Sequence, residues 1–138
     1  MNIAIISGSV RSGRHSHKVA TYLHQQLSLR DGIKVDLMDL HTWQLPILEN
    51  RWKKLDNPPS NLVNFSASLQ TADGLIFVSP EYHGSYTGVL KNAVDHYWHE
   101  FHRKPIGVVA TGSGKFGGIN ASTEMQQLIL SLGAFPMP

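Results

Sequence analysis

The chain of 138 residues contains no cysteine. This absence excludes disulfide frameworks, thiol catalysis and cysteine-ligated metal sites, and it fits a reducing compartment. No segment approaches the roughly 18 consecutive apolar residues that a membrane-spanning helix needs. The amino terminus begins with a strand-like pattern, not with a basic, then apolar, then small-residue leader. We therefore expect a cytoplasmic protein with no membrane partner.

Charge of one sign is also scarce, because 12 Lys and Arg residues stand against 10 Asp and Glu residues, with a formal net charge of +2. Neither sign forms a long block, so the basic footprint of a nucleic-acid-binding protein is missing and we expect no nucleic-acid partner. The length and the 41% hydrophobic content suit a single domain spanning residues 1–138.

Short apolar runs alternate with helix-like stripes along the chain. The runs cover residues 2–7, 33–38, 75–79 and 106–111. The stripes are Val19, Leu23 and Leu27, then residues 62–69, then Val89, Leu90, Ala93, Val94 and Tyr97, and last Ala121, Met125, Leu128 and Leu132. This alternation predicts an α/β fold, a doubly wound parallel sheet between two helical layers.

Two regions depart from this alternation. Between His41 and Ser60 the pattern lapses, which predicts an irregular connection with a turn or two of helix. After Gly133 the chain reads AFPMP, so we expect that the fifth strand and the helix that would follow it are absent and that the domain lacks its C-terminal end.

Three polar or glycine-rich loops follow predicted strands, at residues 8–16, 80–88 and 112–118. In a parallel sheet they meet at one edge, where ligands bind. The first loop, GSVRSGRHS, combines hydroxyls, arginines and a helix start, which favours a phosphate monoester. The candidate ligands are Ser9, Arg11, Arg14, Ser16 and His17. The alternative is that Ser16 only caps the helix and that the arginines are solvated.

Two nucleotide motifs are incomplete. Gly8 and Gly13 have the spacing of a triphosphate-binding loop, but Arg14 and His15 stand where Lys and Ser or Thr are needed. The segment GSGKFG matches the dinucleotide pattern G-x-G-x-x-G, but no strand with an acidic residue follows it. We interpret both matches as accidental.

The segment PEYHGSYTGVLKNAVDHYW, together with GSVRSGRHS, resembles the NADPH-dependent FMN reductase family, whose fold is flavodoxin-like with strand order 2-1-3-4-5. The family motif GS-x-R-x-x-S appears as Gly8, Ser9, Arg11 and, after a longer insert, Ser16. The family motif PEYN-x-S-x-x-G-x-LKNAID matches Pro80, Glu81, Tyr82, Ser85, Gly88, Leu90, Lys91, Asn92, Ala93 and Asp95. His83 replaces the usual Asn, and Val94 replaces the usual Ile.

The resemblance implies an FMN-dependent reductase. Ser9, Arg11, Ser16 and His17 would hold the FMN phosphate, Pro80, Glu81, Tyr82, His83, Gly84 and Ser85 would line the isoalloxazine, and Gly112 and Ser113 would approach its pyrimidine edge. Hydride would pass from NADPH or NADH to N5 of FMN, and then to a flavin, quinone or similar acceptor. No side chain would be catalytic, since the flavin carries the chemistry. Family resemblance also implies a homodimer or homotetramer.

Two alternatives remain open at this point: a flavodoxin-type electron carrier, and a non-enzymatic flavin-binding regulatory module. We expect Glu81 to be structural and not a general base. His96, His99 and His102 sweep around a helix instead of sharing one face, so no metal site is expected. Four aromatic residues could roof a ligand, but we expect them to pack in the core or at a subunit contact: Trp43, Trp52, Tyr97 and Trp98.

Overall fold

A five-stranded parallel sheet with strand order β2-β1-β3-β4-β5 organises residues 1–137, the part of the chain that the computed structural model describes. The strands are β1 (Asn2–Ser7), β2 (Lys34–Asp39), β3 (Gly74–Pro80), β4 (Pro105–Thr111) and β5 (Phe135–Pro136). The helices are α1 (His15–Ser28), α2 (Leu40–Trp43), the 3-10 turn η1 (Trp52–Lys54), α3 (Ser60–Thr71), α4 (Gly88–Asp95) and α5 (Ile119–Ser131). The predicted doubly wound sheet is therefore confirmed.

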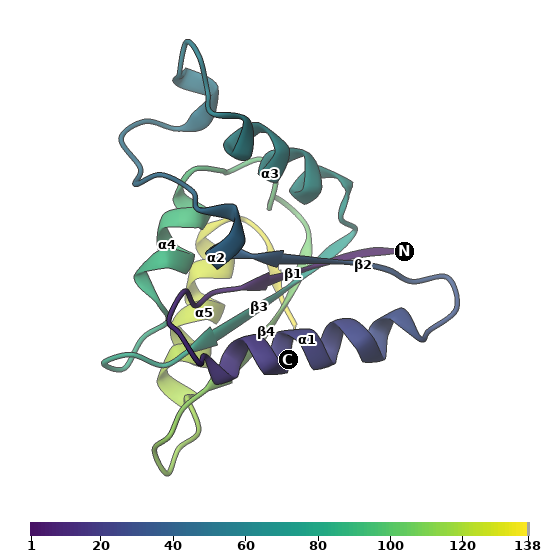
Figure 1. Ribbon diagram of the computed structural model, residues 1–138, viewed down its shortest axis with the longest axis vertical. Coiled ribbons are helices and arrows are strands. Elements are labelled where there is room, and N and C mark those ends of the chain that lie inside the picture. The colour runs from purple at the N-terminus through teal and green to yellow at the C-terminus, as the bar shows by residue number, and fades with distance from the viewer. Residues whose placement is uncertain (138) are drawn as a thin grey trace.

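Helices cover both faces of the sheet (Figure 1). Because side chains alternate along a strand, Ile5 and Val78 pack toward α1. Their neighbours Ile6 and Phe77 belong to the larger core, which α3, α4 and α5 cover on the other face. The apolar runs are thus buried on both sides, as expected for parallel strands.

The prediction that the fifth strand is absent was wrong. Phe135 and Pro136 pair in parallel with Pro105 and Ile106 of β4. Gly133, at φ +66°, turns the chain after α5, and the amide N–H of Phe135 then donates to the carbonyl of Lys104 at 2.9 Å. The sequence pattern did not indicate this strand because Pro136 lacks an N–H and proline is rare in strands. Proline is tolerated in an edge strand, which is the position of β5.

The connection between His41 and Ser60 is irregular apart from α2 and η1, as predicted. Side chains of α4 and the residues after it hold it in place. The Asn92 side chain donates to the carbonyl of Pro46 at 2.8 Å and accepts from the N–H of Leu48 at 2.9 Å. The indole N–H of Trp52 donates to Glu100 at 3.2 Å.

Three of the four aromatic residues pack as predicted. The Trp43 ring meets Phe65 edge-on at 5.1 Å, and Tyr97 stacks on the same ring at 5.4 Å. Trp52 lies against the core beside Tyr97. Trp98 is 40% exposed and its ring lies against the Arg51 guanidinium, so its packing at a subunit contact stays a prediction.

Candidate cofactor site

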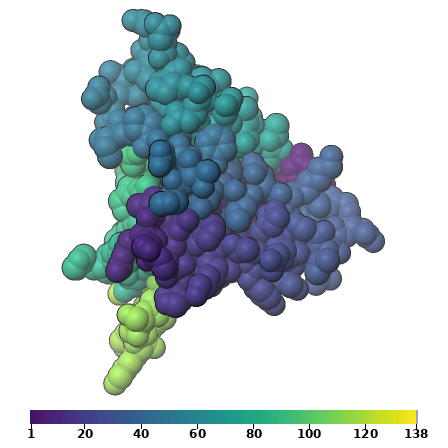
Figure 2. Space-filling model, viewed as in Figure 1, coloured from purple at the N-terminus to yellow at the C-terminus, as the bar shows by residue number. Residues whose placement is uncertain are grey.

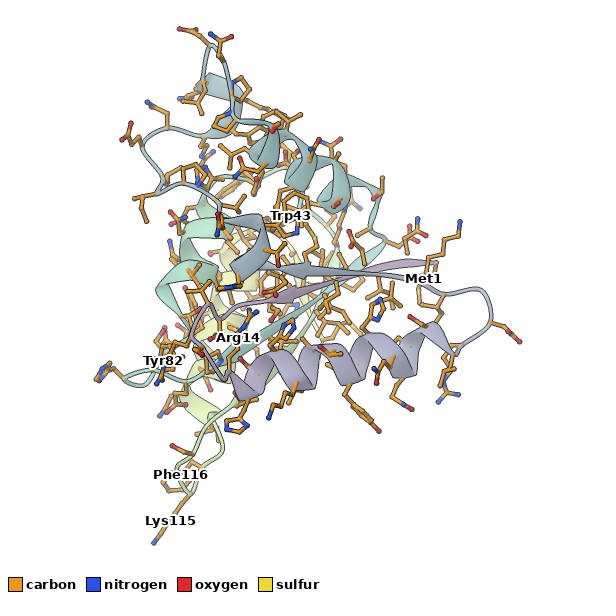
Figure 3. The ribbon with its side chains drawn as sticks, in the orientation of Figure 1. Met1, Arg14, Trp43, Tyr82, Lys115 and Phe116 are labelled. Atoms are coloured by element: carbon orange, nitrogen blue, oxygen red, sulfur yellow. The ribbon has the colours of Figure 1, made fainter. Side chains whose placement is uncertain are left out.

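The three predicted loops meet at the carboxyl end of the sheet and enclose a cleft of about 420 Å³. Figure 3 shows Arg14 and Tyr82 at this end of the molecule, on the same side as Lys115 and Phe116. The residues that line the cleft are Ser9, Arg11, Ser12, Gly13, Arg14, His15, Ser16, Pro80, Glu81, Tyr82, Thr111, Gly112 and Ser113.

The start of α1 opens into the cleft without a side-chain cap. Arg14 precedes the helix but forms no capping hydrogen bond, and the first turn has no acidic residue. Ser16 lies inside the helix, and its hydroxyl, buried at 1% exposure, has no hydrogen-bond partner among residues 1–137. The alternative that Ser16 only caps the helix is therefore wrong. No acidic residue within the first turn of α1 offsets the positive end of the helix dipole.

Arg11 brings a guanidinium to the same cleft. Its guanidinium carbon lies 5.6 Å from the centre of the Tyr82 ring, and it belongs to none of the ion pairs within the described part of the chain. The Tyr82 hydroxyl is 3.5 Å from the Ser9 hydroxyl. Burial alone would raise the pKa of Tyr82, but hydrogen bonds with Ser9 and Arg11 and the Arg11 charge outweigh it, so this pKa is lowered.

Arg14 and His17 have protein partners. Arg14 donates to both carboxylate oxygens of Asp39, at 2.5 and 2.8 Å, and to the carbonyl of Ser9 at 2.5 Å. His17 Nδ1 lies 3.2 Å from the Ser7 hydroxyl and 3.6 Å from Asp39. Arg14 still lines the cleft, whereas His17 is outside its lining. The two candidates thus differ from Arg11, because each faces the same carboxylate.

The second loop contains a tight turn at residues 82–85. Tyr82 and Ser85 exchange backbone hydrogen bonds of 2.8 and 3.2 Å, and the residues between them, His83 and Gly84, have φ values of +52° and +79°. Positive φ at both central positions is the mark of a type I′ turn. Histidine tolerates this conformation almost as asparagine does, so His83 preserves the turn. His83, Gly84 and Ser85 do not line the cleft, while Pro80, Glu81 and Tyr82 do.

Glu81 connects the second loop to α5. One carboxylate oxygen accepts from the N–H of Ala121 at 3.1 Å, and the other accepts from the Asn120 side chain at 3.3 Å. Ala121 is in the first turn of α5, where backbone N–H groups lack helical partners and a negative charge is favourable. These contacts fit the structural role expected for Glu81.

Thr87 connects the second loop to the first. Its hydroxyl donates to the carbonyl of Gly8 and accepts from the N–H of Leu90, which caps α4. A side chain at Gly8 would be crowded, because its Cβ would lie 3.1 Å from the carbonyl oxygen of Val78. The first two loops are therefore fixed to each other at their bases.

The third loop is narrow at its base and exposed at its tip. A Cβ on Gly112 would lie only 2.8 Å from the backbone nitrogen of Gly118, so the two ends of the loop approach as only glycine allows. The loop stands out from the body of the molecule (Figure 2), with Lys115 and Phe116 near its tip (Figure 3). Phe116 is 81% exposed. Glycine here serves a backbone turn, not a dinucleotide fingerprint.

Sequence reasoning omitted four residues that line the cleft, namely Ser12, Gly13, His15 and Thr111. The first three lie within GSVRSGRHS, so treating the whole loop as a binding surface would have included them. Thr111 ends β4, directly before the Gly112 that was identified. Within residues 1–137 no group of three or more His, Cys, Asp or Glu residues could hold a metal ion. None of the helices in this range is long and apolar enough to cross a membrane.

A parallel sheet of order 2-1-3-4-5, with a cleft at its carboxyl edge and an uncapped helix start after β1, defines a flavodoxin-like α/β protein. The model of the family described as NADPH-dependent FMN reductase matches residues 1–138, and the chain belongs to this family. The resemblance that rested on two motifs is thereby confirmed.

Characterised relatives include the FMN-dependent NADPH-azoreductase of Staphylococcus haemolyticus, 35% identical over 127 residues, which cover 90% of this chain and 65% of that protein. The NAD(P)H-dependent FMN reductase LOT6 of Saccharomyces cerevisiae is 30% identical over 145 residues, covering 96% of this chain and 75% of that one. Among solved structures, the flavoenzyme NAD(P)H:(acceptor) oxidoreductase FerB from Paracoccus denitrificans superposes with a TM-score of 0.81 at 25% identity, over 99% and 75% of the chains. The chain thus spans slightly less than two thirds of the azoreductase.

Proposed function

We propose that this protein binds FMN in the cleft and uses NADPH or NADH to reduce a small-molecule acceptor such as a flavin or a quinone. The observation that carries the proposal is the Ser16 hydroxyl, buried and without a partner in the described chain, at the open start of α1. A buried hydroxyl without a partner costs about 1–3 kcal/mol. A phosphate oxygen at this position would supply the missing hydrogen bond.

The first loop suits a phosphate monoester in charge as well as in shape. Such a group carries about −1.5 to −2 charges at neutral pH. Arg11, which forms no ion pair with residues 1–137, offers two parallel N–H donors to phosphate oxygens. The uncapped first turn of α1 adds backbone N–H groups and the positive end of its dipole. Ser9 and Ser12 bring further hydroxyls to the cleft.

The other two loops suit a flat ring. Pro80 and Tyr82 offer rigid apolar surface, and Gly112 and Ser113 let the backbone come close to a ring edge. Bound FMN supplies the hydride chemistry, and the protein positions the ring and excludes water. Glu81 is not used as a general base in this proposal, because both of its carboxylate oxygens accept hydrogen bonds from the start of α5.

We also propose a homodimer or homotetramer in which a second copy covers the exposed tip of the third loop. Phe116 and Ile119 support this arrangement, because two large apolar side chains that are 81% and 57% exposed and close in the chain form an apolar surface that association would bury. Sedimentation equilibrium would measure the assembly. A monomer at all accessible concentrations would contradict this part of the proposal.

Reduction of the FMN-loaded protein by NADPH under anaerobic conditions tests the activity. We expect rapid bleaching of the flavin absorbance and rapid recovery of colour when a quinone is added. An electron carrier would bleach slowly with NADPH alone and rapidly only with a partner reductase. A regulatory module would bind FMN without bleaching. Either of these results would replace the reductase proposal.

A further inference from the structure

Asp39 and Arg14 form a two-point ion pair beside the cleft. The two nitrogen–oxygen distances are 2.5 and 2.8 Å, and the side chains are only 14% and 13% exposed. The same guanidinium donates a third hydrogen bond, to the carbonyl of Ser9 at 2.5 Å. Arg14 is therefore held by the protein at three points and joins the end of one strand to the loop that follows another.

The sheet explains why a residue this far along the chain reaches the first loop. β2 pairs with β1 in parallel, and the last pair in the register is Ser7 with Asp39. The first loop begins directly after Ser7, so the end of β2 lies next to its base. A parallel partner strand thus places a carboxylate where the loop needs an anchor.

Every polar group that faces the Asp39 carboxylate favours its charged form. The N–H of His41 donates to it at 3.1 Å, and His17 Nδ1 lies 3.6 Å away. Burial alone would raise the pKa of Asp39, but the hydrogen bonds from Arg14 and His41 and the charges of Arg14 and His17 outweigh it, so the pKa is lowered. Asp39 stays ionised at neutral pH, and its charge offsets that of Arg14.

We propose that Asp39 is a positioning residue for the FMN phosphate: it holds Arg14 as a clamp on the Ser9 carbonyl and so fixes the loop that presents Ser9, Arg11 and Ser16. In this arrangement Arg14 acts through the loop and is not itself the phosphate ligand. Arg11 then supplies the guanidinium that recognises the phosphate. The inference rests on the proposed function and adds a second layer to its binding site.

The direction in which Asp39→Asn changes FMN affinity distinguishes this clamp from an alternative in which Arg14 binds the phosphate directly. If Arg14 were a phosphate ligand that Asp39 restrains, Asp39→Asn would free its charge and FMN would bind as tightly as before or more tightly. If Asp39 positions the loop, Asp39→Asn loosens it and FMN binds more weakly. The affinity for riboflavin, which lacks the phosphate, would change little, because the loosened loop contacts only the phosphate.

The experiment measures the Kd values of FMN and riboflavin for the full chain by flavin fluorescence. For Asp39→Asn we expect FMN affinity to fall about 10-fold, as when an outer partner that orients a ligand is removed, while riboflavin affinity changes less than about 2-fold. Asp95→Asn is the matched control, because Asp95 pairs with Lys91 at 2.6 Å on α4 and does not line the cleft. It should leave both affinities unchanged.

Three results would overturn the inference: unchanged FMN affinity, increased FMN affinity, or a parallel loss for both flavins, which would indicate general loosening of the fold. If Asp39→Asn does not fold, Asp39→Glu serves instead, because it keeps the charge that would restrain Arg14 but displaces the carboxylate from the forked contact. The clamp then predicts weaker FMN binding, and the alternative predicts unchanged binding. If the unsubstituted chain binds neither flavin, the proposed function fails and takes the inference with it. If the unsubstituted chain binds FMN but Asp39→Asn leaves the ratio of the FMN and riboflavin affinities unchanged, only the inference about Asp39 is wrong.

Discussion

Two buried serines give a paired test of the phosphate site. Ser16 and Ser66 are both 1% exposed and both lie in helices. The Ser66 hydroxyl donates to Glu100 at 2.8 Å and accepts from Gln70 at 3.0 Å. The Ser16 hydroxyl has no partner in the chain up to residue 137. The same substitution, Ser to Ala, should therefore have opposite consequences at the two positions.

In the protein without ligand, Ser66→Ala removes a hydrogen bond to a carboxylate, worth about 1.5–3 kcal/mol. Alanine returns up to about 0.5 kcal/mol of helix propensity, so we expect the free energy of unfolding to fall by about 1–2.5 kcal/mol. Ser16→Ala removes no hydrogen bond and receives the same propensity gain. Its free energy of unfolding should rise by about 1–3 kcal/mol, because the substitution removes a buried hydroxyl that has no partner in the ligand-free protein.

For FMN binding, Ser16→Ala should be the more damaging of the two substitutions. Ser16→Ala loses one hydrogen bond to a charged phosphate, about 1.5–3 kcal/mol, which is a loss of roughly 10- to 150-fold in affinity. Ser66 does not line the cleft, so Ser66→Ala should bind FMN as the unsubstituted protein does. Urea unfolding with and without FMN measures both quantities in one series.

Either of two findings would refute this reasoning. A loss of more than about 1 kcal/mol in Ser16→Ala without ligand would mean that the hydroxyl already has a structural partner of ordinary strength. Unchanged FMN affinity in the same variant would mean that no phosphate reaches the start of α1.

Arg11→Ala should weaken FMN binding by about 1.5–3 kcal/mol, measured by fluorescence titration. The control is Arg51→Ala, which removes a guanidinium that also lies over an aromatic ring but outside the cleft. Equal losses of FMN affinity in the two variants would contradict the assignment of Arg11 to the phosphate. Glu100 has a pKa below its usual 4.5, because its hydrogen bonds, chiefly from Ser66, outweigh burial, so its contribution to stability is complete above pH 4.5 and lost as pH falls through the lowered pKa. Chemical unfolding of Glu100→Gln across pH should show a difference from the unsubstituted protein that shrinks only in acid; a constant difference would argue against this role. Gly112→Ala should lower the free energy of unfolding by about 1–3 kcal/mol through overpacking and should weaken FMN binding. Gly114→Ala, which has open space around its Cβ, should do neither. Equal thermal unfolding temperatures for the two variants would disprove the close approach of Gly112 to Gly118.

The sequence predicted most of the fold because the apolar runs and helical stripes follow one alternation from end to end. It missed β5 because that strand has only two residues and one is Pro136. Pairing with β4 comes from backbone hydrogen bonds, such as that from Met137 to Ile106. Backbone pairing between distant segments leaves no periodic trace in so short a run of side chains.

The loops of the site were predictable, but the partners of individual side chains were not. Arg11 and Arg14 look equivalent in GSVRSGRHS, yet within residues 1–137 only Arg14 pairs with a carboxylate, because sheet pairing brings Asp39 beside it. Likewise, the sequence could not decide whether Ser16 caps α1, since that depends on where the helix begins. The pairing of β1 with β2 decided the first question, and the position of the first residue of α1 decided the second.

Addition of FMN to the purified chain, followed by gel filtration, tests the cleft assignment most directly. We predict that the protein emerges yellow, with about one FMN per chain, as expected of one phosphate site at one helix start. A colourless protein, with all of the FMN in the small-molecule fractions, would contradict the assignment of the cleft to FMN.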